Sequence, residues 1–386
     1  MRIISLAYSD VDSGWELAKI HFNKLTLLVG ASGVGKTQIL TSLLRLRSLS
    51  RGERIRGIKW EIHFLVDNGD EYVWSGAFEQ TGRNVQFTIT GEDSERSIAK
   101  ISWEKLVHNG QIIVDRQADH IAFKGVSTVK LPRDKSVFNL LKEEELLAPA
   151  YEGFQKIIFS DQVNSRKHSL NIQSNFLHQQ QLLERYVDIN AIRAADETLL
   201  TKLFLSFHNA PSIMEQIVER FTDVFPFVEA VRFAPLDLKN IGEVPAFVRE
   251  MPFLQIKEVG VEHWILQPEI SSGMYRSLLH LCELYLTANG TIVLIDEFEN
   301  SLGVNCIDEI TADIQIAAQR GLQFVITSHH PYIINQIHHK NWKLITRQGS
   351  VVTAKDAATI IDFQVSKQEA FIQLTQREEF TTGIAS

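Results

Sequence analysis

Residues 25–40, LTLLVGASGVGKTQIL, restrict the fold of this chain more than any other stretch. An apolar run typical of a buried strand leads into a glycine-rich turn, and the turn leads into a segment typical of a helix. Gly30 and Gly35 allow successive backbone N–H groups to converge on a phosphate group, and the positive end of the helix dipole adds to that attraction. The stretch therefore predicts a phosphate-binding loop. The plain alternative is a glycine-rich turn that contains Lys-Thr by chance.

The side chains that follow the glycines have the types that a nucleotide site requires. Gly30, Gly35, Lys36 and Thr37 fit the pattern G-x-x-x-x-G-K-[ST] of the P-loop. Lys36 is predicted to reach the β- and γ-phosphates of ATP, and the Thr37 hydroxyl is predicted to bind Mg²⁺. The predicted nucleotide-binding residues of the loop are Gly30, Ala31, Ser32, Gly33, Val34, Gly35, Lys36 and Thr37.

A second motif lies at residues 291–302, TIVLIDEFENSL. The apolar run Ile292–Ile295 predicts a buried strand that delivers two acidic side chains at its C-terminal end. This is the Walker B arrangement, in which Asp296 completes the Mg²⁺ shell and Glu297, as the catalytic base, polarises the attacking water. A strand followed by an acidic turn is common by itself. Its presence in a chain that also has a P-loop favours the nucleotide interpretation.

A third strand is predicted within LQFVITSHHPYII, residues 322–334. His329 follows the end of this strand, where its imidazole is predicted to donate to a γ-phosphate oxygen, and Pro331 suits the start of the next helix. Other histidines nearby lack the cysteine or carboxylate spacing of a metal site, so we interpret them as surface or capping residues. They are His330, His338 and His339.

Residues 269–276, EISSGMYR, precede an apolar helix-like segment and by themselves indicate only a helix start. Their place in the chain adds more. The order of P-loop, this stretch, Asp296-Glu297 and His329 resembles the motif order of the ABC-type ATPases.

In that resemblance, ISSGM occupies the place of the L-S-G-G-Q signature, from which it departs at Leu, at the first Gly and at Gln. The resemblance implies that the signature contacts the γ-phosphate of an ATP molecule bound by another subunit. It therefore also implies a homodimer or a higher homo-oligomer. The residues concerned are Ser271, Ser272 and Gly273.

Within that class the chain most resembles the ATPase domain of the overcoming-lysogenisation-defect (OLD) group and its relatives in bacterial antiphage systems. IDEFENSL and ITSHHPYII carry this resemblance, which covers residues 1–50 and about 255–350 by motif. It implies an ATPase subunit that acts as a nucleotide-operated sensor or switch for a separate effector, a nuclease or a toxin. We expect no Toprim nuclease domain, because 57 residues follow His329. The alternative is a RecF/SMC-like ATPase head that acts in DNA repair or recombination.

The middle of the chain predicts two further lobes. Alternating apolar and polar residues at 58–90 and a predicted hairpin at 111–125 indicate an antiparallel β lobe, whereas helical spacing at 172–225 indicates two to four helices. A strand at 154–162 ends in Gln162, our candidate for the Q-loop residue of ABC-type ATPases, with Gln117 as the alternative.

The predicted fold is an α/β P-loop NTPase head of the ABC type, with a central mixed sheet, an antiparallel β lobe and a helical lobe. Residues 1–165 are predicted to form the N-terminal part of the head, which includes the P-loop and the β lobe. Residues 166–255 are predicted to form the helical lobe, and residues 256–386 the C-terminal part, with the signature, Walker B and His329.

Composition and charge restrict the location and the partners of the chain. Two cysteines in 386 residues, Cys282 and Cys306, cannot build a disulfide framework or a metal cluster, which favours a reducing cytoplasm. No apolar run approaches the ~20 residues of a membrane-spanning helix, so no membrane contact is expected. The net charge of −8 argues against wholesale coating of nucleic acid. The basic segment Arg45 to Lys59 nevertheless suits a nucleic acid or a phage-protein trigger, and a solvated loop is the equal alternative.

Overall fold

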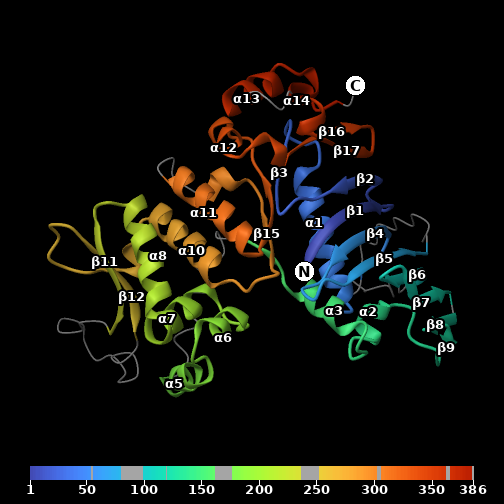
Figure 1. The fold of residues 1–386 in the computed structure, drawn as a ribbon, viewed down its shortest axis with the longest axis horizontal. Coiled ribbons are helices and arrows are strands. Elements are labelled where there is room, and N and C mark those ends of the chain that lie inside the picture. The colour runs from blue at the N-terminus through green and yellow to red at the C-terminus, as the bar shows by residue number, and fades with distance from the viewer. Residues whose placement is uncertain are drawn as a thin grey trace, which may run out of the picture. The chain divides into compact units, whose positions relative to one another are not determined.

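The computed structural model describes residues 1–53, 55–79, 99–118, 120–160, 176–235, 252–301, 306–361 and 366–384. The chain forms two compact units, which we call the sheet unit and the helical unit (Figure 1). The sheet unit comprises Met1–Phe159, Gly290–Asp296 and Gly321–Ser386, and the helical unit comprises Ser160–Asn289 and Glu297–Arg320.

The sheet unit is built on one large mixed sheet. Its strand order is β10-β14-β15-β3-β16-β17-β2-β1-β4-β5-β6-β7-β8-β9. The strands from β10 to β16 in this order are parallel, whereas those from β2 to β9 are antiparallel. The strands are β1 (Arg2–Asp10), β2 (Trp15–His21), β3 (Leu25–Val29), β4 (Ile58–Leu65), β5 (Glu71–Phe78), β6 (Ile101–His108), β7 (Gln111–Gln117), β8 (His120–Phe123), β9 (Val126–Ser127), β10 (Ile157–Phe159), β14 (Ile292–Ile295), β15 (Gln323–Thr327), β16 (Trp342–Gln348) and β17 (Val351–Asp356).

The burial of the strands explains why the two parts of this sheet differ in sequence. Every residue of β3, β14 and β15 is buried, as expected for parallel strands that are covered on both faces. The antiparallel strand β4 instead alternates buried and less buried residues along its length. This alternation confirms the predicted meander over 58–78 and the predicted hairpin of β7 and β8. The rest of the predicted meander, from residue 80 to 90, lies outside the described residues.

An aromatic cluster fixes two short helices to the antiparallel part of the sheet. The rings of Trp74 and Phe138 lie 4.5 Å apart, and Phe154 packs edge-on against Trp74 and Phe64 at 5.2 Å. Phe154 belongs to helix α3 and not to the predicted strand 154–162; among the described residues 154–160 of that segment, β10 is the part that forms a strand. The helices of the sheet unit are α1 (Lys36–Ser50), α2 (Val137–Leu140), α3 (Ala148–Gln155), α12 (Pro331–Gln336), α13 (Lys367–Thr375) and α14 (Glu378–Thr382).

The helical unit combines helices, four of which lie in the predicted helical segment 172–225, with a small sheet that the sequence analysis did not predict. Its three strands have the order β11-β12-β13 and pair antiparallel. The segment 166–255 is therefore not wholly helical. The elements are α5 (Phe176–Arg185), α6 (Ile189–Ala194), α7 (Leu199–Asn209), α8 (Pro211–Val224), β11 (Val228–Ala234), β12 (Phe253–Glu258), β13 (Ile265–Leu266), α10 (Ser272–Leu286) and α11 (Ile307–Arg320).

Helix α10 forms the core of the helical unit. Apolar side chains such as Leu278 and Leu281 are buried, and the helix contacts α7, α8 and α11. Arg320 donates to the carbonyl oxygens of Leu284 at 2.6 Å and of Tyr285 and Thr287 at 3.3 Å. A guanidinium at this end satisfies the last carbonyls and complements the negative end of the helix dipole.

The predicted division into 1–165, 166–255 and 256–386 needs correction in its last part. The strands β14 to β17 pair within the large sheet and belong to the sheet unit. Helices α10 and α11 pack with α7 and α8 and belong to the helical unit. Among the helices that the structure describes, none combines the length and the apolar composition that crossing a bilayer requires.

Candidate nucleotide-binding site

The predicted motifs of the sheet unit meet at one edge of the sheet. Strands β14, β15 and β3 are neighbours and run parallel, so their carboxyl ends lie side by side. The P-loop follows β3, Asp296 follows β14, and His329 lies two residues beyond β15. The carboxyl edge of parallel strands is the usual ligand-binding edge of an α/β sheet.

The P-loop approaches its neighbours so closely that its glycines are required. Gly30 has φ +139°, and a β-carbon on it would lie 2.5 Å from the carbonyl oxygen of Ile345. Gly35 has φ +110° and precedes α1. Because Gly35 supplies no capping side chain, the first N–H groups of α1 have no capping side-chain acceptor to which they can donate. These N–H groups and the helix dipole are suited to an anion such as a phosphate.

Lys36 lies folded against the loop that it follows. Its Nζ donates to the carbonyl oxygens of Gly30 at 2.9 Å and Ala31 at 2.7 Å, and lies 3.5 Å from Nδ1 of His329. The side chain is only 5% exposed. The structure thus brings together the P-loop lysine and the histidine beyond β15, as their predicted roles require.

The Asp296 carboxylate joins the other two motifs. Its Oδ1 accepts a hydrogen bond from Thr37 Oγ1 at 3.2 Å and another from Thr327 Oγ1 at 2.6 Å. Thr37 and Asp296, the predicted Mg²⁺ ligands, are therefore direct neighbours although 259 positions separate them in the chain. Thr327, a buried residue, was not predicted to belong to the site. Its position at the end of β15, directly before Ser328-His329, was the available signal.

These residues fit a magnesium ion. Mg²⁺ in nucleotide sites is held by one or two protein oxygens, with phosphates and waters completing the shell. Oδ2 of Asp296 accepts no hydrogen bond from the described residues, which leaves this oxygen available for a metal. Among the described residues there is no group of three or more His, Cys, Asp or Glu side chains that could hold a metal ion by themselves.

Glu297, the predicted catalytic base, has an unusual backbone. Its φ is +46°, in the left-handed region that residues other than glycine seldom adopt. Strained residues of this type cluster at functional sites. The observation supports a functional role for the residue that directly follows Asp296.

The signature residues start helix α10 of the helical unit. Ser271 is the N-cap residue, and its hydroxyl accepts a hydrogen bond from the N–H of Met274 at 3.3 Å. Ser272 is exposed, and a β-carbon on Gly273 would meet no atom within 4 Å. An open glycine at the first turn of a long helix can present its N–H to an external anion. Ser271, by contrast, acts mainly as a cap.

Of the two candidates for the Q-loop residue, the structure describes only Gln117, and it lies far from the site. Gln162 lies outside the described residues, two positions beyond Ser160, whose Oγ donates to Glu283 of α10 at 2.5 Å. Gln117 ends β7, the twelfth strand in the sheet order, whereas β3 is the fourth. At about 4.8 Å per strand this separation exceeds the reach of a side chain, so Gln117 is not a nucleotide contact.

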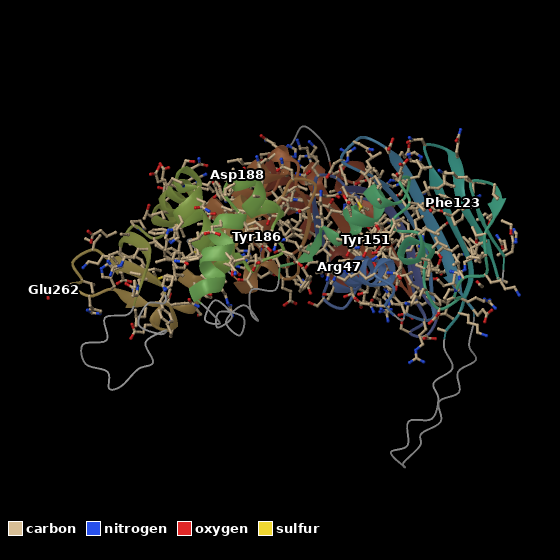
Figure 2. All side chains as sticks on the ribbon, turned by 90° about the horizontal axis from the view of Figure 1, so that it is seen from below. Arg47, Phe123, Tyr151, Tyr186, Asp188 and Glu262 are labelled. Carbon is tan, nitrogen blue, oxygen red and sulfur yellow. The ribbon has the colours of Figure 1, made fainter. Side chains whose placement is uncertain are left out.

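The basic segment differs from its prediction. Arg45 and Arg47 lie within helix α1 and not in a solvated loop. Both side chains bond to other residues of the sheet unit. Arg45 pairs with Asp10, and Arg47 donates to the carbonyl oxygen of Ile157 at 2.5 Å. Figure 2 labels Arg47 on α1 and Tyr151 on the neighbouring helix α3.

Among the described residues of the segment, Arg56 and Lys59 are exposed. Arg51 donates to Gln155 at 2.6 Å, and Arg54 lies outside the described residues.

The other histidines and the cysteines have structural roles. His338 caps a short helical turn by accepting from the N–H of Lys340 at 3.2 Å, as predicted. His339 is buried against Trp342, so the prediction of a surface residue is wrong there. Burial lowers the pKa of the His339 imidazole. Cys282 and Cys306 are both buried, and the Ser277 hydroxyl donates to Cys306 Sγ at 3.2 Å.

Residues 25–335 match the protein family described as "AAA domain, putative AbiEii toxin, Type IV TA system" (AAA_21). The chain belongs to this family. The match begins at the strand before the P-loop and ends within α12, so it spans every motif of the site. Membership therefore agrees with the α/β P-loop fold. No curated protein matches the sequence.

Several solved structures are similar in fold at low sequence identity. One is the SmcHead bound to the C-winged helix domain of ScpA, with 14% identity, a TM-score of 0.48, and coverage of 92% of this chain and 97% of that chain. Another is the SMC head domain from Thermotoga maritima, with 12% identity, a TM-score of 0.45, and coverage of 92% and 99%. A third, from Pyrococcus furiosus, is an Smc head with an extended coiled coil bound to the C-terminal domain of ScpA, with 12% identity, a TM-score of 0.45, and coverage of 97% and 99%.

Proposed function

We propose that this chain binds ATP with Mg²⁺ and hydrolyses it, and that two copies complete each ATP site. One observation carries the ATP assignment: at the carboxyl edge of the sheet, Lys36 Nζ lies 3.5 Å from His329 Nδ1, and the Thr37 hydroxyl donates to Asp296 at 3.2 Å. These residues come from three motifs that lie far apart in the sequence.

Each residue has a distinct task in this proposal. The N–H groups of the P-loop and the Lys36 ammonium bind the phosphates, and Lys36 exchanges its carbonyl partners for phosphate oxygens. Thr37 and Asp296 supply oxygen ligands to Mg²⁺, which neutralises phosphate charge when bound. Thr327 holds the Asp296 carboxylate in its orientation.

Hydrolysis requires a base and a way to stabilise charge. Glu297 accepts a proton from water as the water oxygen bonds to the γ-phosphorus, and the bond to the β–γ bridging oxygen breaks to release ADP. His329 donates to a γ-phosphate oxygen. Ser272 and Gly273 of a second copy provide the remaining donors, in keeping with the place of the signature in ABC-type ATPases.

We further propose that the ATP cycle controls a separate effector, a nuclease or a toxin, in bacterial antiphage defence. The motif resemblance to the OLD group supports this reading, and so does the description of the matched family, which names a putative toxin. Exposed Arg56 and Lys59 are the cations that remain for an acidic trigger or a nucleic acid. The presence of only two cysteines in 386 residues favours a cytoplasmic location.

Phosphate release and ATP binding by Lys36→Ala test the ATP assignment. We expect wild-type protein to bind ATP and release phosphate, and the variant to lose binding. Binding of ATP by Lys36→Ala at wild-type affinity would remove the basis of the proposal. Arrested growth of cells that express the chain, relieved by the same substitution, would support a toxin-linked role.

A further inference from the structure

A turn near the C-terminal end of the sequence lies directly against the P-loop. The turn follows α14, and its Gly383 has φ +73°. A β-carbon built on Gly383 would lie 2.3 Å from Cγ1 of Val34 and 3.1 Å from Cβ of Ala31. Any side chain at position 383 would therefore displace either the turn or the P-loop.

We propose that this segment, Glu378–Ile384, holds the P-loop in its ATP-binding conformation, and that Gly383 is the positioning residue. We call the segment the C-terminal turn. The inference rests on the proposed function, because it concerns the affinity of the same loop for ATP. It assigns to a segment outside every nucleotide motif a part in ATP binding.

The C-terminal turn is anchored independently of the P-loop. The Gly383 carbonyl oxygen accepts a hydrogen bond from the N–H of Arg347 in β16 at 2.7 Å. Glu379, which is 7% exposed, accepts a hydrogen bond from Lys355 of β17 at 2.6 Å. Because β16 also pairs with β3, one strand fixes both the strand that leads into the P-loop and the turn that covers it.

The P-loop has few side chains with which to fix its own shape. A glycine-rich loop loses much conformational freedom when it becomes ordered, so packing from outside contributes to its order. Val34 is 5% exposed, and the C-terminal turn is in contact with its Cγ1. On the other side, the Ile345 carbonyl oxygen abuts Gly30. The loop is thus held between β16 and the C-terminal turn.

A pair of glycine substitutions separates this effect from general destabilisation. Gly383→Ala introduces a β-carbon against Val34 and Ala31. Gly349→Ala is the matched control, since Gly349 also has positive φ (+61°) but a β-carbon there would meet no atom within 4 Å. Both substitutions carry the cost of an alanine in the left-handed region, and only the first reaches the P-loop.

The test measures three quantities for each variant: the Kd for the fluorescent analogue mant-ATP, the Tm without nucleotide, and the rate of amide hydrogen exchange in the P-loop. We expect Gly383→Ala to raise the Kd about tenfold and to speed exchange at residues 30–37, while Gly349→Ala leaves both unchanged at a similar loss of Tm.

Two outcomes would overturn the inference while leaving the proposed function in place. They are a wild-type Kd in Gly383→Ala and equal losses of affinity in both glycine variants. Failure of the wild-type protein to bind mant-ATP would overturn the proposed function itself, and the inference with it.

Discussion

At the scale of single residues, the Asp296 carboxylate is where the motifs of the chain meet. One of its oxygens accepts hydrogen bonds from the hydroxyl groups of Thr37 in α1 and Thr327 in β15. Two donors on one oxygen fix the orientation of the carboxylate. Its other oxygen is then in position to bind a metal ion. When a residue that donates a hydrogen bond to a metal ligand is removed, the affinity for the metal commonly changes 10–100-fold.

We therefore expect Thr327→Val to raise the Mg²⁺ concentration needed for half-maximal ATP binding by about 10–100-fold. Valine keeps the shape of the buried threonine and removes only its hydroxyl. Thr346→Val is the control, because Thr346 is equally buried but its hydroxyl pairs with Thr353 at 2.8 Å. Titration of Mg²⁺ at fixed ATP measures the effect, and with EDTA the wild type and Thr327→Val should bind ATP alike. Equal Mg²⁺ requirements of the two valine variants would refute the role of Thr327.

Glu297 has a different task from Asp296, and its neutralisation should have a different effect. Glu297→Gln keeps the size of the side chain and removes its basicity, so ATP should still bind. Turnover should fall by about 10²–10⁴-fold, the usual effect of losing a general base. Phosphate release at saturating Mg²⁺-ATP measures turnover, and a filter assay measures bound ATP. Turnover at the wild-type rate would show that Glu297 is not the base.

At the scale of elements, long-range contacts fix segments whose own sequences are weak signals. Glu104 of β6 is fully buried, and it accepts from Trp74 Nε1 and Val137 N at 2.9 Å and lies 3.5 Å from the Arg116 guanidinium. Arg116 in turn donates to the carbonyl oxygen of Lys135 at 2.7 Å. Glu104 and Arg116 thereby fix the connection before α2 to the strands β5, β6 and β7 of the antiparallel part of the sheet.

Glu104→Gln should destabilise the protein by about 3–5 kcal/mol, because it leaves the Arg116 charge buried without its partner. Replacing both residues by methionine should cost less than that. Glu61→Gln is the control, since Glu61 pairs with Lys19 at 2.9 Å with about half of each side chain exposed, and such a pair contributes ~0–1 kcal/mol. Calorimetric unfolding measures all three, and a Glu104→Gln loss no larger than that of Glu61→Gln would contradict the account.

The elements that could be predicted are those whose pattern is local. Strands β3, β14 and β15 are short, mostly apolar segments that are buried throughout, and the Ser271 cap of α10 needs only the neighbouring residues. β6 and β11 were not predicted, because their stability comes from pairing with strands elsewhere in the chain.

The same reason applies within the site. The P-loop, Asp296 and His329 follow from motifs, but the Thr327 contact and the approach of Gly383 depend on the sheet. The hydrogen bond from Arg47 to the Ile157 carbonyl oxygen, 110 positions away in the chain, could not be predicted from the sequence either.

At the scale of the whole molecule, the proposed ATP site needs two copies of the chain. One copy contributes the P-loop, Asp296 and His329 from its sheet unit, and the other contributes Ser272 and Gly273 at the start of α10. A closed dimer then contains two equivalent sites. Substitutions in the two half-sites should therefore complement each other when they are placed on different copies.

The most direct test mixes Lys36→Ala protein with Ser272→Arg protein and measures phosphate release. Alone, Ser272→Arg protein should bind ATP and Lys36→Ala protein should not. Neither variant alone should hydrolyse ATP. In an equal mixture about half of the dimers carry one of each, and such a dimer retains one site with both halves intact, so up to about a quarter of wild-type turnover should return. A mixture as inactive as its two components, with mixed dimers shown by mass, would contradict the shared site.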